Sequence, residues 1–145
     1  CPGKYIVIVT GELSAVNASV QAAITQHPLH LIDSFVLGNP AEEIFPAIYG
    51  ASRVSEVKAL GIIETYDAAA IIVAADQAAK TAEVSLIEIR LARGMCGKSY
   101  LLITGEVAAV EAAIANAQKS VEPHGMFLDS SGIARPDKKF IDHIM

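Results

Sequence analysis

The sequence predicts an α+β fold made of two tandem copies of a β-α-β-β-α-β unit, the split βαβ or ferredoxin-like arrangement. Three observations carry this prediction. The chain repeats itself at an offset of 94 residues, so that Gly3 matches Gly97. Residues 84–91 alternate between apolar and polar side chains, which is the period of a half-buried strand. Residues 106–117 instead place apolar side chains at helical spacing.

The repeat is the most informative of these patterns. Nine of the 21 residues at positions 3–23 are identical to residues 97–117, and most of the others are conservative replacements. After a slip of two residues the match resumes, with Pro40 opposite Pro136. A match of this length indicates a tandem duplication.

The two repeats are expected to differ in completeness. Residues 58–145 are predicted to hold a whole domain, and residues 1–57 only the C-terminal half of one. The first repeat has no counterpart of residues 58–94, which are expected to form a strand, a helix and a strand. Such a half-domain would expose an unpaired strand edge and an apolar face. The sequence is therefore interpreted as a shortened form of a longer tandem protein.

The strand at 84–91 is expected to place Ile87, Ile89 and Leu91 on one face and Glu88 and Arg90 on the other. The whole second repeat is predicted to contain a strand at 59–64, a helix at 67–80, strands at 84–91 and 99–103, a helix from 106, a strand near 126–128 and a helix at 137–144. Asp67 is of a residue type that suits the start of the first helix.

Composition excludes several classes of protein. A net charge of −5 without any basic block argues against a nucleic-acid partner. The longest apolar run, residues 68–75, is far shorter than the roughly 18 to 20 residues that cross a bilayer. Two cysteines without a signal peptide favour a reducing cytoplasm. The hydrophobic fraction of 52% excludes disorder and predicts extensive subunit interfaces.

Residues 59–65, which read ALGIIET, resemble the opening strand of bacterial microcompartment shell domains. The resemblance continues through Ala74-Ala75-Asp76, Thr104-Gly105-Glu106 and Arg135-Pro136, and it covers essentially the whole chain. It is greatest to the tandem shell proteins of the propanediol-utilisation type, which share the Cys-Pro-Gly-Lys of residues 1–4. Tyr66 stands where shell proteins commonly have an edge lysine, and this subgroup also carries a large aromatic there.

The resemblance implies a homotrimer of tandem chains that forms a pseudo-hexameric tile. Such tiles pack with other microcompartment shell proteins, edge to edge, around encapsulated enzymes in the cytoplasm. In this family the loop between the second and third strands faces the central axis. Lys4 and Lys98, which repeat at the same place, either set the charge near this pore or are solvated strand-end lysines. The residues implied to line the pore are Cys1, Pro2, Gly3, Gly94, Met95, Cys96 and Gly97.

The resemblance also implies a cofactor. In the propanediol-utilisation subgroup a cysteine directly before Pro-Gly is a ligand of a 4Fe–4S cluster, and Cys1 occupies that place. One cysteine cannot hold a cluster that needs about four thiolates, but three copies of Cys1 around a threefold axis would supply three. One cluster per trimer is therefore expected, for electron or cluster transfer across the shell. In the alternative, Cys1 is an inert pore residue and the pore passes metabolites.

No nucleophile, base and orienting group stand in a recognisable set, so the chain is not expected to be an enzyme. The remaining catalytic alternative is a self-cleaved N-terminal-nucleophile hydrolase, in which the α-amino group would activate the Cys1 thiol. Pro2, directly after the nucleophile, argues against it. Cys96 matches Pro2 in the repeat and is interpreted as a loop thiol, and His27 and His30 as structural residues.

Overall fold

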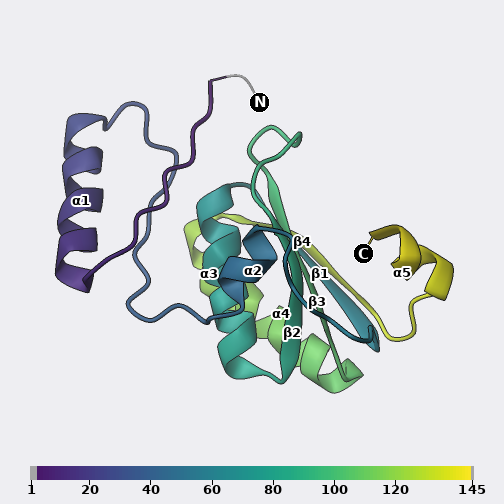
Figure 1. Cartoon of the computed structure of the whole chain (residues 1–145). Helices are drawn as coiled ribbons and strands as arrows, with labels where there is room; N and C mark the ends of the chain where they lie inside the picture. Colours follow the sequence, from purple (N-terminus) through teal and green to yellow (C-terminus); the bar gives the residue numbers. More distant parts are fainter. Residues whose placement is uncertain (1–2, 145) are drawn as a thin grey trace.

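One antiparallel sheet organises the C-terminal three-fifths of the chain, with helices on both of its faces (Figure 1). This computed structural model describes residues 3–144. The strand order is β2-β3-β1-β4. The strands are β1 (Ala59–Thr65), β2 (Val84–Arg90), β3 (Ser99–Gly105) and β4 (Phe127–Ile133). Helices α3 (Ala68–Thr81) and α4 (Val107–Val121) cover one face, and α5 (Lys138–Ile144) lies over the other.

For residues 58–144 the predicted order of strands and helices is confirmed, with one large difference in extent. The last strand was expected near residues 126–128 and runs from Phe127 to Ile133 instead. Residues 129–132, Asp-Ser-Ser-Gly, have the composition of a turn, which hides the strand from propensity alone. Backbone pairing with β1, for example of Gly132 with Gly61, overrides that preference.

Strand β2 contains a bulge that a simple alternation did not predict. The pairing register with β3 shifts between Leu86 and Glu88, which leaves Ile87 as an extra residue. Ile87 therefore packs in a small cluster on the α5 side of the sheet, whereas Ile89 packs in the core under α3 and α4. The prediction that Ile87 and Ile89 share one face is wrong for this reason.

The core between the sheet and helices α3 and α4 combines large aliphatic side chains with several small residues. A Cβ on Gly61 would lie 2.6 Å from Ile103 Cγ1 and 2.8 Å from Val110 Cγ1, so only glycine fits the middle of β1. Five alanines of the two helices are fully buried, and their small side chains let the helices approach each other and the sheet. They are Ala74, Ala75, Ala78, Ala113 and Ala117.

Helix α3 begins at an aspartate cap, as the sequence predicted. Asp67 Oδ1 accepts a hydrogen bond from Ala70 N at 2.7 Å. The other oxygen, Oδ2, is buried and has no hydrogen-bond partner within residues 3–144. Burial raises the pKa of the Asp67 carboxyl, and the hydrogen bond from Ala70 opposes that shift.

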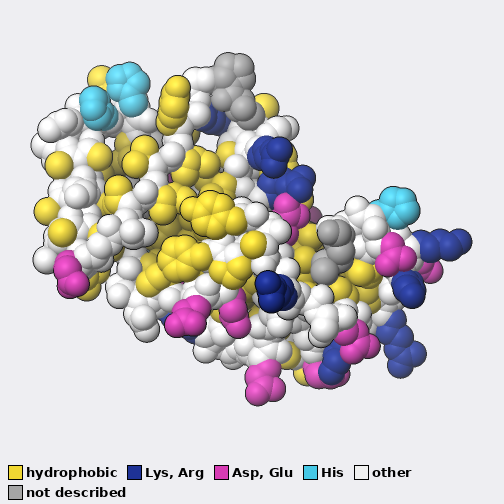
Figure 2. Space-filling model, in the orientation of Figure 1, with side chains coloured by type: hydrophobic (Ala, Val, Ile, Leu, Met, Phe, Trp, Pro, Cys, Tyr) yellow, Lys and Arg dark blue, Asp and Glu magenta, His cyan; other side chains and the backbone are white. Residues whose placement is uncertain are grey.

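Residues 3–57, called here the N-terminal region, contain two helices, α1 (Leu13–Gln26) and α2 (Ile44–Ile48). Helix α1 has no buried residue. The segments before and after it, residues 4–10 and 31–37, are extended and belong to no strand. Figure 2 shows hydrophobic side chains gathered on the face between α1 and α2. The most exposed large hydrophobic residues of this region are Tyr5, Val7, Leu29, Ile32 and Tyr49.

The end of the N-terminal region is tied to the sheet domain, which comprises residues 58–144. Ile44 and Ala47 of α2 are buried in the core under α3 and α4. Asp76, itself buried, accepts a hydrogen bond from Ala41 N at 2.9 Å and pairs with Lys80 at 2.7 Å. Lys80 Nζ also donates to the carbonyl oxygen of Asn39 at 2.5 Å. Residues 39–48 therefore pack as part of the sheet domain.

Candidate functional site at the loop between strands β2 and β3

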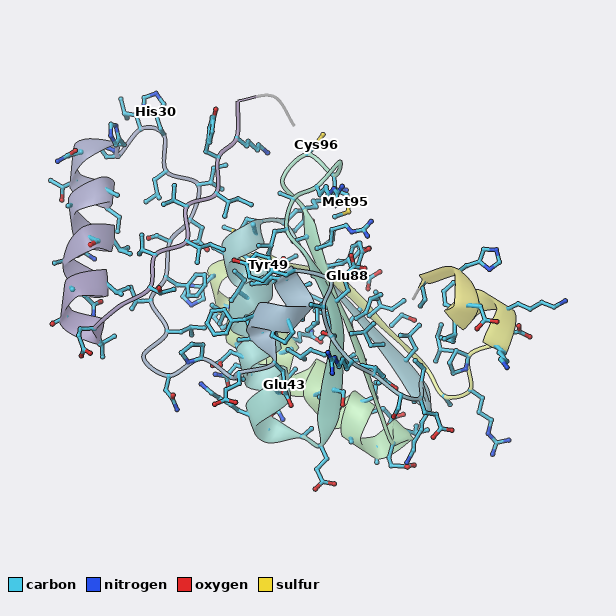
Figure 3. The ribbon with its side chains drawn as sticks, viewed as in Figure 1. His30, Glu43, Tyr49, Glu88, Met95 and Cys96 are labelled. Carbon is cyan, nitrogen blue, oxygen red and sulfur yellow. The ribbon has the colours of Figure 1, made fainter. Side chains whose placement is uncertain are left out.

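A tight loop joins β2 to β3 and extends beyond the edge of the sheet (Figures 1 and 3). The hydroxyl oxygen of Ser99, the first residue of β3, accepts a hydrogen bond from Ala92 N at 2.9 Å. Within the loop, Lys98 N donates to Met95 O at 3.1 Å. Its backbone has positive φ at four places, and two of these, Ala92 at 54° and Cys96 at 56°, are not glycines. A non-glycine residue is strained in this region, so the loop holds an uncommon conformation.

The N-terminal region reaches this loop through one lysine. Lys4 Nζ donates a hydrogen bond to the carbonyl oxygen of Cys96 at 2.6 Å. Gly97 is buried beneath the same side chain, and a Cβ there would lie 2.6 Å from Lys4 Nζ. The Lys4 side chain lies directly against Gly97. The structure thus places Lys4 of the first repeat on the loop of the second repeat.

The residues predicted to line a pore fall into two groups. Gly94, Met95, Cys96 and Gly97 share the loop, with Gly94 and Cys96 exposed and Met95 half-buried. Gly3, also exposed, precedes the lysine that contacts this loop. Cys1 and Pro2 lie outside the described residues.

The described residues do not by themselves form a metal site. No group of three or more His, Cys, Asp or Glu within residues 3–144 is arranged to hold a metal ion. Cys96 is a free, exposed thiol at the end of the loop (Figure 3). His27 and His30 are exposed, and His30 N donates to His27 O at 3.1 Å in the turn after α1.

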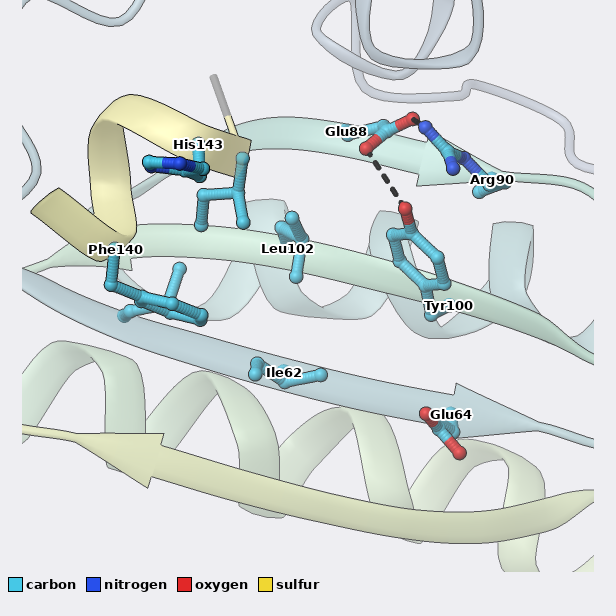
Figure 4. A pocket seen from close by; sticks show the side chains of 10 residues that line it. Ile62, Glu64, Glu88, Arg90, Tyr100, Leu102, Phe140 and His143 are labelled. Carbon is cyan, nitrogen blue, oxygen red and sulfur yellow. Dashed lines mark hydrogen bonds and ion pairs between the residues drawn. The ribbon is translucent and has the colours of Figure 1, made fainter. Parts of the chain in front are cut away.

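Three polar side chains at the base of the loop form a hydrogen-bonded group. Arg90 donates to Glu88 Oε1 from Nε at 2.9 Å and from Nη2 at 2.7 Å, and the Tyr100 hydroxyl donates to Glu88 Oε2 at 3.1 Å (Figure 4). The Arg90 guanidinium also lies 5.3 Å from the centre of the Tyr100 ring. Each oxygen of Glu88 therefore accepts at least one hydrogen bond, and the group holds Arg90 and Tyr100 in fixed orientations.

The pKa values of Tyr100 and Arg90 are both raised. Burial raises the pKa of Tyr100, and the negative charge of Glu88 raises it further. The hydrogen bond to Glu88 raises the pKa of Arg90. Tyr100 therefore stays protonated and Arg90 stays charged at neutral pH.

The same three residues close the polar end of a cavity of about 350 Å³ between the sheet and α5. Leu102 lies in its floor, and Phe140 and His143 of α5 lie at the rim (Figure 4). A second carboxylate, that of Glu64, also lines the cavity. Sequence analysis placed Glu88 and Arg90 on one face of a strand but gave them no role. Their role could not be predicted because Arg90 meets Tyr100 through the pairing of β2 with β3, and the register of that pairing is known only from the structure.

None of the helices in the described part of the chain is both long enough and apolar enough to span a membrane.

The fold and the repeated loop sequence define a class of protein. The family profile of the BMC domain matches residues 1–40 and 59–136, so the chain belongs to the BMC domain family. It is 36% identical, over 136 residues, to the bacterial microcompartment shell protein PduT of Citrobacter freundii. The matched region covers 94% of this chain and 74% of that protein. The predicted membership among bacterial microcompartment shell proteins is confirmed by this relative.

A solved structure agrees with the sequence relative. The crystal structure of a microcompartments protein from Desulfitobacterium hafniense DCB is 40% identical and superposes with a TM-score of 0.81. The superposition covers 91% of this chain and 73% of that chain.

Proposed function

We propose that the chain is a structural tile of a bacterial microcompartment shell, that it assembles as a homotrimer, and that its role is not catalytic. The observation that carries this proposal is its likeness to a shell protein over 94% of its length. The family profile matches residues 1–40 as well as 59–136, which supports two BMC repeats per chain, the first of them incomplete in these residues. Three chains of two repeats each would make a pseudo-hexameric ring around one axis.

The contact between Lys4 and the loop at Cys96 supports a shared axis. Corresponding loops of neighbouring repeats in a ring face the same centre, so they lie near each other. Within this chain, Lys4 of the first repeat already donates to the carbonyl oxygen of Cys96 in the second. We place the pore at these loops, with Gly94, Met95 and Cys96 of each chain facing it.

For the cofactor, we propose that Cys1 of three chains holds one 4Fe–4S cluster at this pore. One chain has two cysteines, fewer than the roughly four thiolates of a cluster, so several chains would have to supply the ligands. An iron–sulfur cluster would supply electron-transfer chemistry at the centre of the tile. The exposed backbone around Gly94 and Cys96 leaves room at the loop for such a group.

The lateral contacts would be made by apolar surface. Tyr66 is 52% exposed just after β1, at the position where the resemblance locates the tile edge. Other shell proteins of the same compartment are the partners that we propose for this edge, and encapsulated enzymes for a face of the tile. The location that follows is the shell of a microcompartment in the cytoplasm.

The test measures assembly and cofactor together. The chain is reconstituted anaerobically with iron and sulfide, and its mass is measured by native mass spectrometry beside its visible and EPR spectra. We expect a trimer with broad visible absorption. Cys1→Ser should remove the absorption and keep the trimer, and the matched control Cys96→Ser should keep both.

Each other outcome contradicts a defined part of the proposal. A colourless trimer after reconstitution would contradict the cluster and leave a tile with a metabolite pore. If the absorption is lost in Cys96→Ser but kept in Cys1→Ser, the cluster ligand is Cys96 and the assignment to Cys1 is wrong. A chain that remains monomeric at every concentration would contradict the tile itself.

A further inference from the structure

The cavity of about 350 Å³ between the sheet and α5 has an apolar end and a polar end (Figure 4). Its walls follow the alternation of the strands, because residues two apart on a strand share a face. On β1 the residues that line it are Leu60, Ile62 and Glu64. The register places Ile62 opposite Leu102 and Glu64 opposite Tyr100 on β3. The apolar end therefore lies under α5, and the polar end lies toward the loop between β2 and β3.

The polar end carries an uncompensated negative charge. The charges of Glu88 and Arg90 offset each other, since Arg90 Nη2 lies 2.7 Å from Glu88 Oε1. Glu64 forms no ion pair with any residue of 3–144. The residue directly opposite Glu64 on β4 is Asp129, so the pairing puts a second carboxylate on the same face of the sheet. Like charges opposite each other in a sheet are unfavourable, and a cation beside Glu64 would relieve their repulsion.

The apolar end offers surface that a hydrocarbon chain can cover. Phe140 lines this end and is still 43% exposed, and Ile62 is half-buried. Leu102 lies between them in the floor. Covering such side chains removes apolar surface from water, which is favourable in proportion to the area covered. An apolar pocket with a few placed polar groups is typical of small-molecule sites.

Helix α5 closes the cavity with few contacts of its own. None of its residues is buried. Ile141 and Ile144 hold it to the sheet by packing against a small cluster that includes Leu60 and Leu102. A molecule that touches Phe140 from inside the cavity would add to these contacts. A ligand in this cavity should therefore also stabilise α5.

We propose that this cavity binds a primary alkylammonium ion, with its ammonium group beside Glu64 and its alkyl chain between Leu102 and Phe140. The charge of the lining favours a cation over an anion, because Glu64 and Glu88 outnumber Arg90. An organic cation fits better than a metal ion, since within residues 3–144 no group of three or more His, Cys, Asp or Glu is arranged to hold one. The inference requires neither the trimer nor the pore.

The first test compares four ligands on the full chain at neutral pH by saturation-transfer NMR titration. We expect n-hexylammonium to bind at least about fivefold more tightly than n-hexanol, which has the same chain without the charge. Methylammonium keeps the charge without the chain and should bind at least about 50-fold more weakly, because each buried methylene contributes about fourfold in affinity. n-Hexanoate should not bind, because its charge is repelled by Glu64.

Two variants separate the charge from the apolar wall. Glu64→Gln removes the charge and should weaken n-hexylammonium binding at least about fivefold while leaving n-hexanol binding unchanged. The matched control is Glu111→Gln, which removes the same charge from an exposed position on α4 and should change neither. Phe140→Ser removes part of the rim and should weaken both ligands alike. Glu64 and Phe140 are exposed, so these changes should spare the fold.

Hydrogen exchange locates the ligand independently of the variants. If α5 must move before the ligand leaves, exchange in residues 138–144 slows by the factor by which the ligand stabilises the closed form. At a concentration of n-hexylammonium ten times its Kd this factor is about tenfold. Exchange in α1, which does not line the cavity, should stay the same.

The proposal is overturned if n-hexylammonium does not bind, if n-hexanol binds as tightly, or if n-hexanoate binds. Equal effects of Glu64→Gln and Glu111→Gln also overturn it, because the attraction would then come from the overall charge of the chain. Binding without slower exchange in α5 would place the ligand elsewhere on the molecule, and the assignment to this cavity would be wrong.

Discussion

Residues 5–9 and 99–103 occupy the same place in the repeat and have nearly the same apolar character, yet only the second segment forms a strand. Val7 is 82% exposed, whereas its counterpart Leu101 is completely buried. Residues 5–9 are all β-branched or aromatic, the types that favour strands, whereas residues 99–103 have two such residues, Tyr100 and Ile103. The difference lies in their partners, because β3 pairs with β1 and β2 while residues 5–9 have neither.

The comparison teaches that strand propensity acts through pairing. A run such as Tyr5-Ile6-Val7-Ile8-Val9 gains little by being extended alone, because its backbone then bonds only to water. Helix α1 forms in the same region because its hydrogen bonds lie within one segment. The helix therefore persists where the flanking strands do not.

The largest expected effect contrasts the two segments directly. Leu101→Ala should lower the free energy of unfolding by about 2 to 5 kcal/mol, because it leaves a cavity in a packed core. Val7→Ala should change it by less than about 0.5 kcal/mol, since the side chain is already exposed. Urea unfolding of both variants measures the contrast. Equal losses would show that Val7 is buried in solution.

A second prediction concerns the contact that joins the two regions. Asp76→Ala removes the acceptor of Ala41 N and the partner of Lys80. We expect a loss of about 2 kcal/mol of unfolding free energy, since a part-buried amide is left unsatisfied. Amide exchange at Ala41 should rise in parallel. Glu111→Ala, an exposed acidic residue on α4, is the control and should leave both quantities unchanged.

A third prediction concerns the pH dependence of the α3 cap. Because burial raises the pKa of Asp67 in the folded chain above its unfolded value, the folded state binds the proton more tightly. This contribution is complete below the ordinary Asp pKa and is lost as pH rises through the raised value. Asp67→Asn removes the titration but keeps an oxygen for Ala70 N. Its stability relative to the native chain should therefore increase between about pH 4 and pH 7.

Urea unfolding of both proteins across that range makes the comparison. Asp67→Ala, measured alongside, should be less stable than Asp67→Asn by about 1 kcal/mol at every pH, because neither variant titrates and only the asparagine keeps the cap. If the stability of Asp67→Asn relative to the native chain falls as the pH rises, the pKa of Asp67 is lowered on folding and the prediction is wrong.

The smallest expected effect is at the loop. Lys4→Ala should cost less than about 1 kcal/mol, because the hydrogen bond to Cys96 O is exposed to water. Its larger consequence is local: the amides of residues 94–98 should exchange faster. Lys98→Ala, the counterpart in the repeat, is the matched control. If both variants behave alike, Lys4 does not hold the two loops together.

The sheet domain could be predicted from the sequence because its signals are local. The period of β2, the helical spacing of α4 and the aspartate before α3 each depend on neighbouring residues. The extent of β4 and the bulge at Ile87 could not be predicted, since both are set by pairing between strands. The same holds for the cluster of Glu88, Arg90 and Tyr100, whose members meet only across the sheet.

The position of the loop at residues 94–97 could be predicted from the sequence, and its role at a pore stays a prediction. The repeat placed Gly3 and Gly97 in equivalent loops, and the family resemblance gave those loops a role. No pattern in the sequence indicated that Lys4 donates to Cys96 O, because the two residues are separated by 92 positions. The burial of Gly97 under that lysine is a consequence of tertiary contact alone.

The central position of β1 also has a consequence for the order of folding. Within residues 3–144, β1 precedes both of its partners, β3 and β4, in the chain. The sheet therefore closes around β1 only after residues 127–133 have been synthesised, so the folding of this domain waits for long-range pairing.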